Sequence, residues 1–386
     1  MLEITTTKAL SEFCNACTTQ DFVTVDTEFL REKTYYSKLC LIQIAYDGDG
    51  KNDAALVDVL ADGLDLAPLY ALFDDESVIK VFHAARQDLE IFFHESGRLP
   101  TPFFDTQVAA MVCGFGEQVG YERLVRAICD AELDKSSRFT DWSNRPLSDK
   151  QKRYAVGDVT YLRDIYKDLS KRLTESKRTG WVGEELEVLL DPATYNIDPA
   201  DAWKRVKMRS SSKRMLAAVM ELAAFREHHA QTHNIPRNRV FKDDALLEMA
   251  ATRPKSSNDF KNMRLIQRDV RKNSDIADGI LKALKAADSR DPKTLPKHPK
   301  RNDRPQGVEG LAELLRVFLK ARAEEYKVAT KLIASSSDLD MIASGDYSGP
   351  MFKGWRADVF GDDAKRLCKG ELALSSNGKS VITVPL

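Results

Sequence analysis

Three short apolar runs follow one another between residues 22 and 59, and they constrain the fold more than any other feature. The runs read FVTVDTEF, LCLIQIAYD and AALVDV, and the turn-forming cluster DGDGKND separates the last two. Strand-like runs joined by short connections rich in Gly, Asn and Asp are typical of hairpins. We therefore predict three consecutive strands that form an antiparallel meander.

The segments that follow alternate between helical and strand-like patterns. LAPLYALFDD is predicted as a helix, VIKVFHA as a buried strand, and ARQDLEIFFHESG as a helix that ends before Gly97. TPFFDTQVAAMVCGF gives a further strand and helix. LSDKQKRYAVGDVTYLRDIYKDLSKRL predicts a long amphipathic helix with Ser148 as its N-cap. Strands followed by this alternation predict an α/β domain around a mixed sheet.

No convincing strand pattern returns after about residue 190 until the last few residues. Helical periodicity lapses at DPATYNIDPADAW, which marks a linker, and a second linker, SRDPKTLPKHPKRNDRPQG, is dense in proline and basic residues. We predict three units, namely an α/β domain over residues 1–195, a helical domain over 205–288 and a second helical domain over 308–386.

The charge is distributed unevenly along the chain, although the net charge is −1. Residues 1–199 carry 22 Lys and Arg against 35 Asp and Glu, whereas residues 200–330 carry 29 against 17. An acidic half beside a basic segment suits a catalytic centre next to a surface that binds a polyanion. Solvated surface charge explains the same distribution equally well.

Other bulk features place the chain among soluble cytoplasmic proteins. The sequence has no run of 18 apolar residues, and its N-terminus, MLEITTTKALSEF, lacks the layout of a signal peptide. The six cysteines are scattered, and the lone CxxC of Cys14 and Cys17 has no second pair at zinc spacing. We expect reduced, mostly buried thiols.

Asp26 and Glu28 lie two residues apart in the predicted strand VTVDTEF. Side chains at i and i+2 leave the same face of a strand, so the two carboxylates point together. Two adjacent anions in an apolar strand repel each other unless a cation lies between them, and a hard divalent metal is the natural partner. The alternative is a pair at a strand end that faces solvent.

Two further elements carry acidic residues at suggestive positions. Asp88 lies in the first turns of the helix that follows the buried strand VIKVFHA, and Tyr154 and Asp158 stand at i and i+4 on the long helix. Taken singly, Asp88 is explained by compensation of the helix dipole, and Asp158 by ordinary surface exposure. The order DxE, then D, then YxxxD is what makes the pattern specific.

The chain resembles the ribonuclease D family, in the tyrosine subclass of the DEDD exonuclease superfamily. The residues that carry the resemblance are VDTEF (25–29), LCLIQI (39–44), VFHAARQDLEIF (81–92), FFDTQ (103–107) and DWSNRPLSDKQKRYAVGDVTYL (141–162). The similarity is dense over the first 200 residues. The resemblance implies a ribonuclease H-like exonuclease domain followed by two all-α domains of the HRDC type.

By that resemblance, Asp26 and Glu28 form the first metal-binding motif, Asp88 the second, and Tyr154 with Asp158 the third. The resemblance implies two divalent ions, Mg²⁺ or Mn²⁺, as cofactors of a 3′→5′ hydrolysis that releases 5′-mononucleotides. Tyr154 would then orient the attacking water. No histidine precedes Asp158 by four or five residues, which assigns the tyrosine subclass.

Two residues are weaker candidates for substrate contacts. Phe29 follows the first motif and could stack on the terminal base, although a core aromatic is an equal interpretation. His83 lies just after a strand and could contact phosphate or support Asp88, although a structural histidine explains it somewhat better.

The resemblance also implies RNA as the partner, particularly tRNA precursors and other structured RNAs with single-stranded 3′ tails. The basic segments at 203–214 and 297–304 suit phosphate binding without sequence readout, or they are solvated spacers. Nothing in the sequence indicates an obligate protein partner. Two alternatives stay open, namely a DNA 3′→5′ exonuclease and a non-catalytic adaptor that binds nucleic acid.

Overall fold

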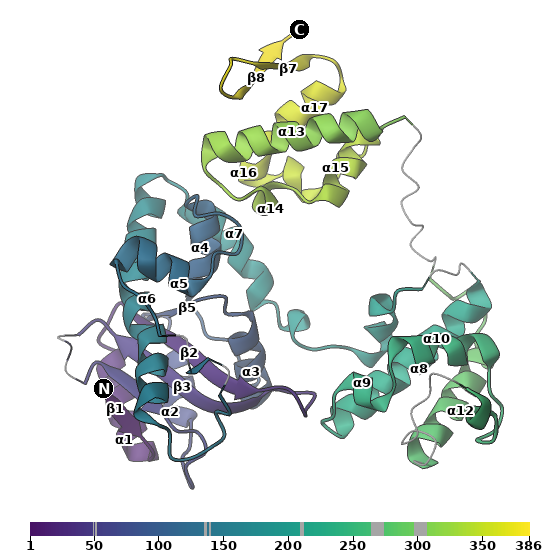
Figure 1. The fold of residues 1–386 in the computed structure, drawn as a ribbon, viewed down its shortest axis with the longest axis horizontal. Coiled ribbons are helices and arrows are strands. Elements are labelled where there is room, and N and C mark those ends of the chain that lie inside the picture. Colours follow the sequence, from purple (N-terminus) through teal and green to yellow (C-terminus); the bar gives the residue numbers. More distant parts are fainter. Residues whose placement is uncertain are drawn as a thin grey trace.

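The computed structural model describes residues 1–48, 50, 52–134, 137–138, 140–208, 212–263, 274–296 and 307–386. Figure 1 draws the α/β unit in purple to blue, the first helical unit in teal to green and the C-terminal unit in yellow-green to yellow. The basic run predicted to contact phosphate at 297–304 lies outside the described residues.

A six-stranded mixed sheet forms the centre of the α/β unit, with the strand order β1-β4-β3-β2-β5-β6. β2, β3 and β4 pair antiparallel, which confirms the predicted meander, whereas β1, β5 and β6 join by parallel pairing. The short strand β1 was not expected from the sequence. The strands are β1 Leu2–Ile4, β2 Phe22–Leu30, β3 Lys38–Tyr46, β4 Ala54–Val57, β5 Ile79–Phe82 and β6 Phe103–Asp105.

Alternate residues of β2 face different helices, because successive side chains of a strand leave opposite faces. Val23 and Val25 belong to the main core, which includes residues of α1, α2 and α3. Thr24 faces α6, since its hydroxyl donates a hydrogen bond of 2.8 Å to the carbonyl oxygen of Val159. The helices are α1 Thr7–Cys17, α2 Ala67–Phe73, α3 Arg86–Ser96, α4 Thr106–Val112, α5 Tyr121–Leu124, α6 Asp149–Glu175 and α7 Thr179–Leu190, and a π-helical turn (η1) spans Val125–Cys129.

The long helix α6 begins where the sequence predicts. Ser148 is its N-cap and forms a capping box with Gln151, in which each side chain bonds to the other residue's backbone N–H. Its buried residues follow at intervals of three or four, so one stripe packs on the sheet. These buried residues are Ala155, Val159, Leu162, Ile165, Leu169 and Leu173.

The first helical unit has a hydrophobic core of its own, separate from the core of the α/β unit. Leu222, Phe241, Leu246 and Ile280 are fully buried in that core. Its helices are α8 Lys213–Thr232, α9 Arg237–Val240, α10 Asp243–Thr252 and α12 Ser274–Ser289, and the 3₁₀ helices of the linker and this unit are η3 Pro192–Thr194, η4 Pro199–Arg205 and η5 Asp259–Asn262.

The C-terminal unit is helical, as expected, except for its last residues. Its elements are α13 Glu309–Tyr326, α14 Thr330–Ile333, α15 Ser336–Ala343, η6 Pro350–Phe352, α16 Gly354–Arg356, η7 Ala357–Gly361, α17 Asp362–Cys368, β7 Leu372–Ser376 and β8 Val381–Pro385. The expectation of an all-α unit did not include the β7–β8 hairpin. A four-residue loop, Asn377–Ser380, joins the two strands, and Gly378 in it has φ +90°.

The C-terminal unit packs directly on the α/β unit, and the two share one continuous hydrophobic core. The indole rings of Trp181 and Trp355 stack with centroids 4.3 Å apart. The backbone N–H of Ala329 donates to the carbonyl oxygen of Met111 at 3.0 Å. Gly114 has φ +85°, and a Cβ there would lie 2.9 Å from the carbonyl oxygen of Lys327, so this contact requires glycine.

Candidate active site

Three carboxylates from two elements meet on the α6 face of the sheet. Asp26 and Glu28 leave the same face of β2, and Asp158 projects from α6, which crosses that face. One ligand oxygen from each of the three lies within 4.8 Å of the others. No other group of three or more His, Cys, Asp or Glu side chains gathers this closely among the residues that the structure describes.

Tyr154 lies one helical turn before Asp158, on the same face of α6. Burial raises the pKa of Asp158, and the neighbouring Tyr154 hydroxyl lowers it by hydrogen bonding, while the Tyr154 and Trp142 rings lie 6.0 Å apart between centroids. Burial, together with the nearby carboxylates, raises the pKa of Tyr154 far above its usual range. The phenol is therefore a hydrogen-bond donor and not a base in this environment.

Asp88 lies apart from this cluster, in the first turn of α3. The side chain of Asp88 is buried and accepts a hydrogen bond from the hydroxyl of Thr27. Thr27 lies between Asp26 and Glu28 on β2, so its side chain leaves the opposite face of the strand. The structure thus brings three of the four predicted carboxylates together and holds the fourth beside them from the α3 side.

The four carboxyl groups all bind protons more tightly than usual. Burial raises the pKa of Glu28 to about 9, with further contributions from the neighbouring carboxylates Asp158 and Asp88. Burial also raises the pKa of Asp88 and of Asp158 to about 7. The pKa of Asp26 is raised well above its usual range by burial and by Asp158, Asp88 and Glu28.

This donor set fits a hard divalent cation. Carboxylate oxygens are the ligands that Mg²⁺ and Mn²⁺ prefer. A cation among buried anions would lower their pKa values and remove the repulsion that now favours protonation. The nearby guanidinium of Arg138 lowers the pKa of Glu28 and of Asp158 only in part.

A cavity of about 350 Å³ opens beside the cluster. Asp26, Tyr154 and Asp158 line it, and so does Arg138, which supplies positive charge next to the acids. Seven other lining residues were, like Arg138, not predicted from the sequence, because they come from several segments with no shared spacing. They are Ala84, Gln107, Gly120, Tyr121, Glu122, Leu133 and Leu162.

The two weaker candidates for substrate contacts occupy different surroundings. His83 lines the cavity, and its Nδ1 lies 3.0 Å from the hydroxyl of Thr106. Its Nε2 is buried without a hydrogen-bond partner, and burial lowers the pKa of the ring. Phe29 is half-buried, packs against the main core and does not line the cavity.

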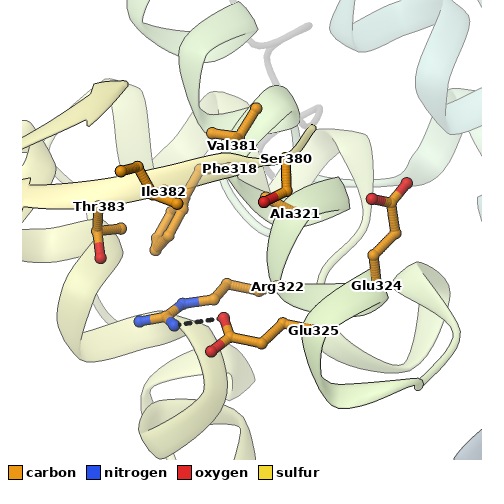
Figure 2. A pocket seen from close by; sticks show the side chains of 9 residues that line it. All are labelled: Phe318, Ala321, Arg322, Glu324, Glu325, Ser380, Val381, Ile382 and Thr383. Carbon is orange, nitrogen blue, oxygen red and sulfur yellow. Dashed lines mark hydrogen bonds and ion pairs between the residues drawn. The ribbon is translucent and has the colours of Figure 1, made fainter. Parts of the chain in front are cut away.

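A larger cavity, of about 490 Å³, lies in the C-terminal unit between α13 and β8 (Figure 2). Arg322 crosses its floor and donates to Glu325 at 2.7 Å, while Phe318 and Ile382 supply apolar walls. The acidic residues there are already paired or isolated, and they form no cluster of metal ligands. This cavity is therefore a weaker candidate for the catalytic centre than the smaller one beside Asp26.

Comparison with known proteins agrees with this geometry. A family described as "3'-5' exonuclease" matches residues 1–174, and the HRDC domain matches residues 215–284. The fold and the acidic site thus define a 3′→5′ exonuclease that carries an HRDC domain. No helix in the described parts of the chain combines the length and apolar character needed to cross a bilayer.

Full-length relatives narrow this class to one family. The chain is 58% identical over 378 residues to ribonuclease D of Jannaschia sp., with 98% of each chain covered. It is 46% identical to ribonuclease D of Acidiphilium cryptum, covering 99% of this chain and 97% of that protein. The crystal structure of Escherichia coli RNase D, "an exoribonuclease involved in structured RNA processing", superposes with a TM-score of 0.81 at 28% identity, covering 95% of this chain and 98% of that one. The chain belongs to the ribonuclease D family of exoribonucleases.

Proposed function

We propose that this protein removes nucleotides one at a time from the 3′ end of RNA, with two divalent metal ions held by Asp26, Glu28, Asp88 and Asp158. The single observation that carries the proposal is the meeting of Asp26, Glu28 and Asp158 within 4.8 Å on β2 and α6. Asp88 stands beside them and would hold the second ion, directly or through water. Bound ions would supply Lewis acidity and generate a nucleophile from water at neutral pH.

The protein's own side chains have separable tasks in this reaction. Asp26 interacts electrostatically with Glu28, Asp88 and Asp158, so it would help to hold the ions together with these three carboxylates. Tyr154 donates a hydrogen bond toward Asp158 and would orient the attacking water through the same hydroxyl. Its raised pKa supports positioning and not proton abstraction. The 5′-mononucleotide would leave through the cavity beside Arg138, whose charge would favour phosphate.

Structured RNAs with short single-stranded 3′ tails, tRNA precursors among them, are the proposed substrates. The excess of Lys and Arg in residues 200–330 supports a polyanionic substrate, because phosphate contacts dominate nucleic-acid affinity. The E. coli relative is described as acting in structured RNA processing, which supports the same class. The proposed domain division, 1–195, 205–288 and 308–386, would place catalysis in the first unit and RNA binding in the helical units.

The decisive experiment uses purified full-length protein, Mg²⁺ and a tRNA with extra 3′ nucleotides. The wild-type protein should release 5′-mononucleotides, and Asp26→Asn should lower the rate by at least about 10³-fold while RNA still binds. Asp164→Asn is the matched control, because Asp164 is exposed on α6 and carries the same charge change outside the site. Full activity of Asp26→Asn would overturn the metal mechanism.

The same assay decides between RNA and DNA. Wild-type protein is given an RNA and a DNA of identical sequence, each with the same 3′ tail, under the same metal concentration. Faster cleavage of RNA supports the proposal, and a preference for DNA would favour the alternative of a DNA exonuclease. Binding of both without cleavage, at any Mg²⁺ or Mn²⁺ concentration, would favour the adaptor.

A further inference from the structure

A crevice of about 330 Å³ lies where the β2–β3 hairpin meets the first helical unit. Figure 1 shows the purple hairpin reaching toward α9. Three arginines from three separate segments line the crevice, namely Arg31 after the end of β2, Arg205 at the end of η4 and Arg237 at the start of α9. Glu90 is the one acidic residue in its lining, so the lining carries a net charge of +2.

The walls of this crevice are fixed by hydrogen bonds across the two units. The Oδ1 atom of Asn234 accepts from the backbone N–H groups of Tyr35 and Tyr36, each at 3.0 Å. The hydroxyl of Tyr35 donates to the buried carboxylate of Glu227 and accepts from Nε2 of Gln231 at 3.3 Å. These contacts hold the arginines from both units around one space, which lowers the entropic cost of binding there.

The arginines keep donors for a ligand. Arg31 forms a bidentate pair with Glu90, with N–O distances of 3.0 and 2.8 Å, and this uses two of its five N–H groups. Arg237 lies 3.5 Å from Glu227, and its side chain remains 38% exposed. Arg205 is exposed at the end of η4. Planar guanidinium groups suit phosphate oxygens, because two parallel N–H donors match two oxygens.

The crevice is close to the acidic cluster along two elements. Arg31 lies just past the end of β2 and follows Glu28 by three residues, which corresponds to about 10 Å of extended chain. Glu90 follows Asp88 by two residues on α3. Arg31 pairs with Glu90 of α3, so a strand of nucleic acid that ends at the cluster and passes around the end of β2 would reach the crevice with phosphates a few nucleotides upstream.

We infer that this crevice binds a backbone phosphate of the RNA upstream of the scissile bond, held by Arg31, Arg205 and Arg237. The inference rests on the proposed function, since it assigns the path of that substrate. Free mononucleotides share the phosphate chemistry and are the competing occupant. An RNA strand differs from a free mononucleotide because an RNA tail can span both sites. Such a tail contacts the acidic cluster at its 3′ end and the arginines of the crevice further upstream.

The test measures RNA affinity in full-length protein that carries Asp26→Asn, so that the RNA is not cleaved. Dissociation constants for RNAs with 3-nucleotide and 12-nucleotide 3′ tails are measured by fluorescence anisotropy across a range of KCl concentrations. Adding Arg205→Gln and Arg237→Gln should weaken binding of the long tail at least about tenfold. The magnitude of the slope of log affinity against log salt should fall by about 0.7, since one single-strand phosphate contact accounts for about 0.7. Binding of the short tail should change much less.

A matched control separates local contact from general charge. Arg290 directly follows α12, pairs with Glu221 of α8 and is 40% exposed, but it does not line the crevice. Arg290→Gln should leave the salt slope of the long tail unchanged. Equal loss in Arg290→Gln, equal loss for both tail lengths, or an unchanged slope in the double variant would overturn the inference. Loss of 5′-AMP binding with no loss for the long tail would assign the crevice to mononucleotides and overturn it as well.

Glu90→Gln gives a readout of opposite sign. Removing this carboxylate frees Arg31 and raises the positive charge of the crevice, so the long tail should bind several-fold more tightly. A purely structural role of the Arg31–Glu90 pair predicts weaker binding and would contradict the inference. These binding measurements do not depend on catalysis. If the wild-type protein cleaves no RNA, the proposed function is refuted, whereas the affinities of the arginine and Glu90 variants still decide whether the crevice binds RNA.

Discussion

The hydroxyl of Thr27 donates a hydrogen bond to the carboxylate of Asp88, across the face of β2 opposite to Asp26 and Glu28. One strand therefore positions three of the four acids, two through its own side chains and one through this hydrogen bond. The α3 helix presents Asp88 in its first turn, where the helix dipole favours an anion. Thr27 fixes which way that anion points.

Thr27→Val removes the hydroxyl and keeps the shape of the side chain. Asp88 then loses a donor that lowers its pKa, so its carboxyl holds a proton more tightly and binds a cation less well. We expect the Mg²⁺ concentration for half-maximal activity to rise roughly tenfold, in line with the usual cost of about 1–3 kcal/mol for an unsatisfied buried partner. Thr27→Ser should restore the wild-type value. An unchanged Mg²⁺ dependence in Thr27→Val would contradict this role.

The raised pKa values of the acids predict how stability depends on pH when metal is removed. Asp88 and Asp158 have pKa values of about 7 in the folded protein and about 3.9 in the unfolded chain. The folded state binds more protons between these values, so this contribution to stability is present at acidic pH and is lost as the pH rises through about 7. Glu28 extends the loss toward pH 9. The melting temperature in EDTA should fall between pH 5 and pH 9.

Both added Mg²⁺ and the substitution Asp158→Asn should reduce the decrease of the melting temperature between pH 5 and pH 9. Excess Mg²⁺ replaces the protons, so its stabilising effect should be largest at the alkaline end of the scan. Asp158→Asn removes one of the titrating groups and should make the melting temperature in EDTA less dependent on pH. A profile in EDTA that stays flat across this window would show that the carboxyl groups are already ionised in the metal-free protein.

Tyr154→Phe tests the positioning role of the phenol. Because the hydroxyl donates and does not ionise near neutral pH, its loss should lower kcat by about 10²-fold without changing the shape of the pH–rate profile. Single-turnover measurements give the rate of cleavage directly. Tyr166→Phe is the control on the same helix, since Tyr166 packs against Phe22 and Phe104 away from the cavity. A shifted pH optimum in Tyr154→Phe would instead indicate proton transfer by the phenol.

Tyr35→Phe tests the contact that joins the β2–β3 hairpin to the first helical unit. Its hydroxyl donates to Glu227, which is fully buried, so the variant leaves that carboxylate short of a partner. We expect a loss of about 1–3 kcal/mol from docking of the two units. Limited proteolysis of the segment between α7 and α8 should become faster. Tyr36→Phe is the control, because it keeps the backbone hydrogen bonds to Asn234, and the protease should cut it at the wild-type rate. Equal proteolysis rates for Tyr35→Phe and Tyr36→Phe would argue against the Tyr35–Glu227 hydrogen bond.

Local patterns account for the parts of the fold that the sequence predicts well. The antiparallel meander follows from apolar runs with short turns, and the start of α6 follows from the capping chemistry of Ser148. The shared face of Asp26 and Glu28 follows from strand geometry, and that of Tyr154 and Asp158 from helical spacing. Each of these features depends on residues a few positions apart, where periodicity is informative.

Contacts between distant segments account for what the sequence did not predict. Asn234 bonds the hairpin at Tyr35 across a separation of 199 residues, and no periodicity links them. β1 is a three-residue strand whose parallel pairing with β4 is visible only once β4 is placed. Arg138 reaches the acids from the segment before α6, and its position depends on the tertiary path of that segment. Such residues are set by the whole fold and not by local sequence.

The stacked indole rings of Trp181 and Trp355 provide an intrinsic spectroscopic probe of the contact between the α/β unit and the C-terminal unit. Their planes are within 10° of parallel, so their electronic transitions should couple and give a paired signal in near-ultraviolet circular dichroism. Trp181 belongs to α7 and Trp355 to the C-terminal unit, so the paired signal is present only while the C-terminal unit packs against α7. The two remaining tryptophans are Trp142, near Tyr154, and Trp203, on η4. Packing of the C-terminal unit against the α/β unit during RNA binding can therefore be followed by circular dichroism without an attached dye.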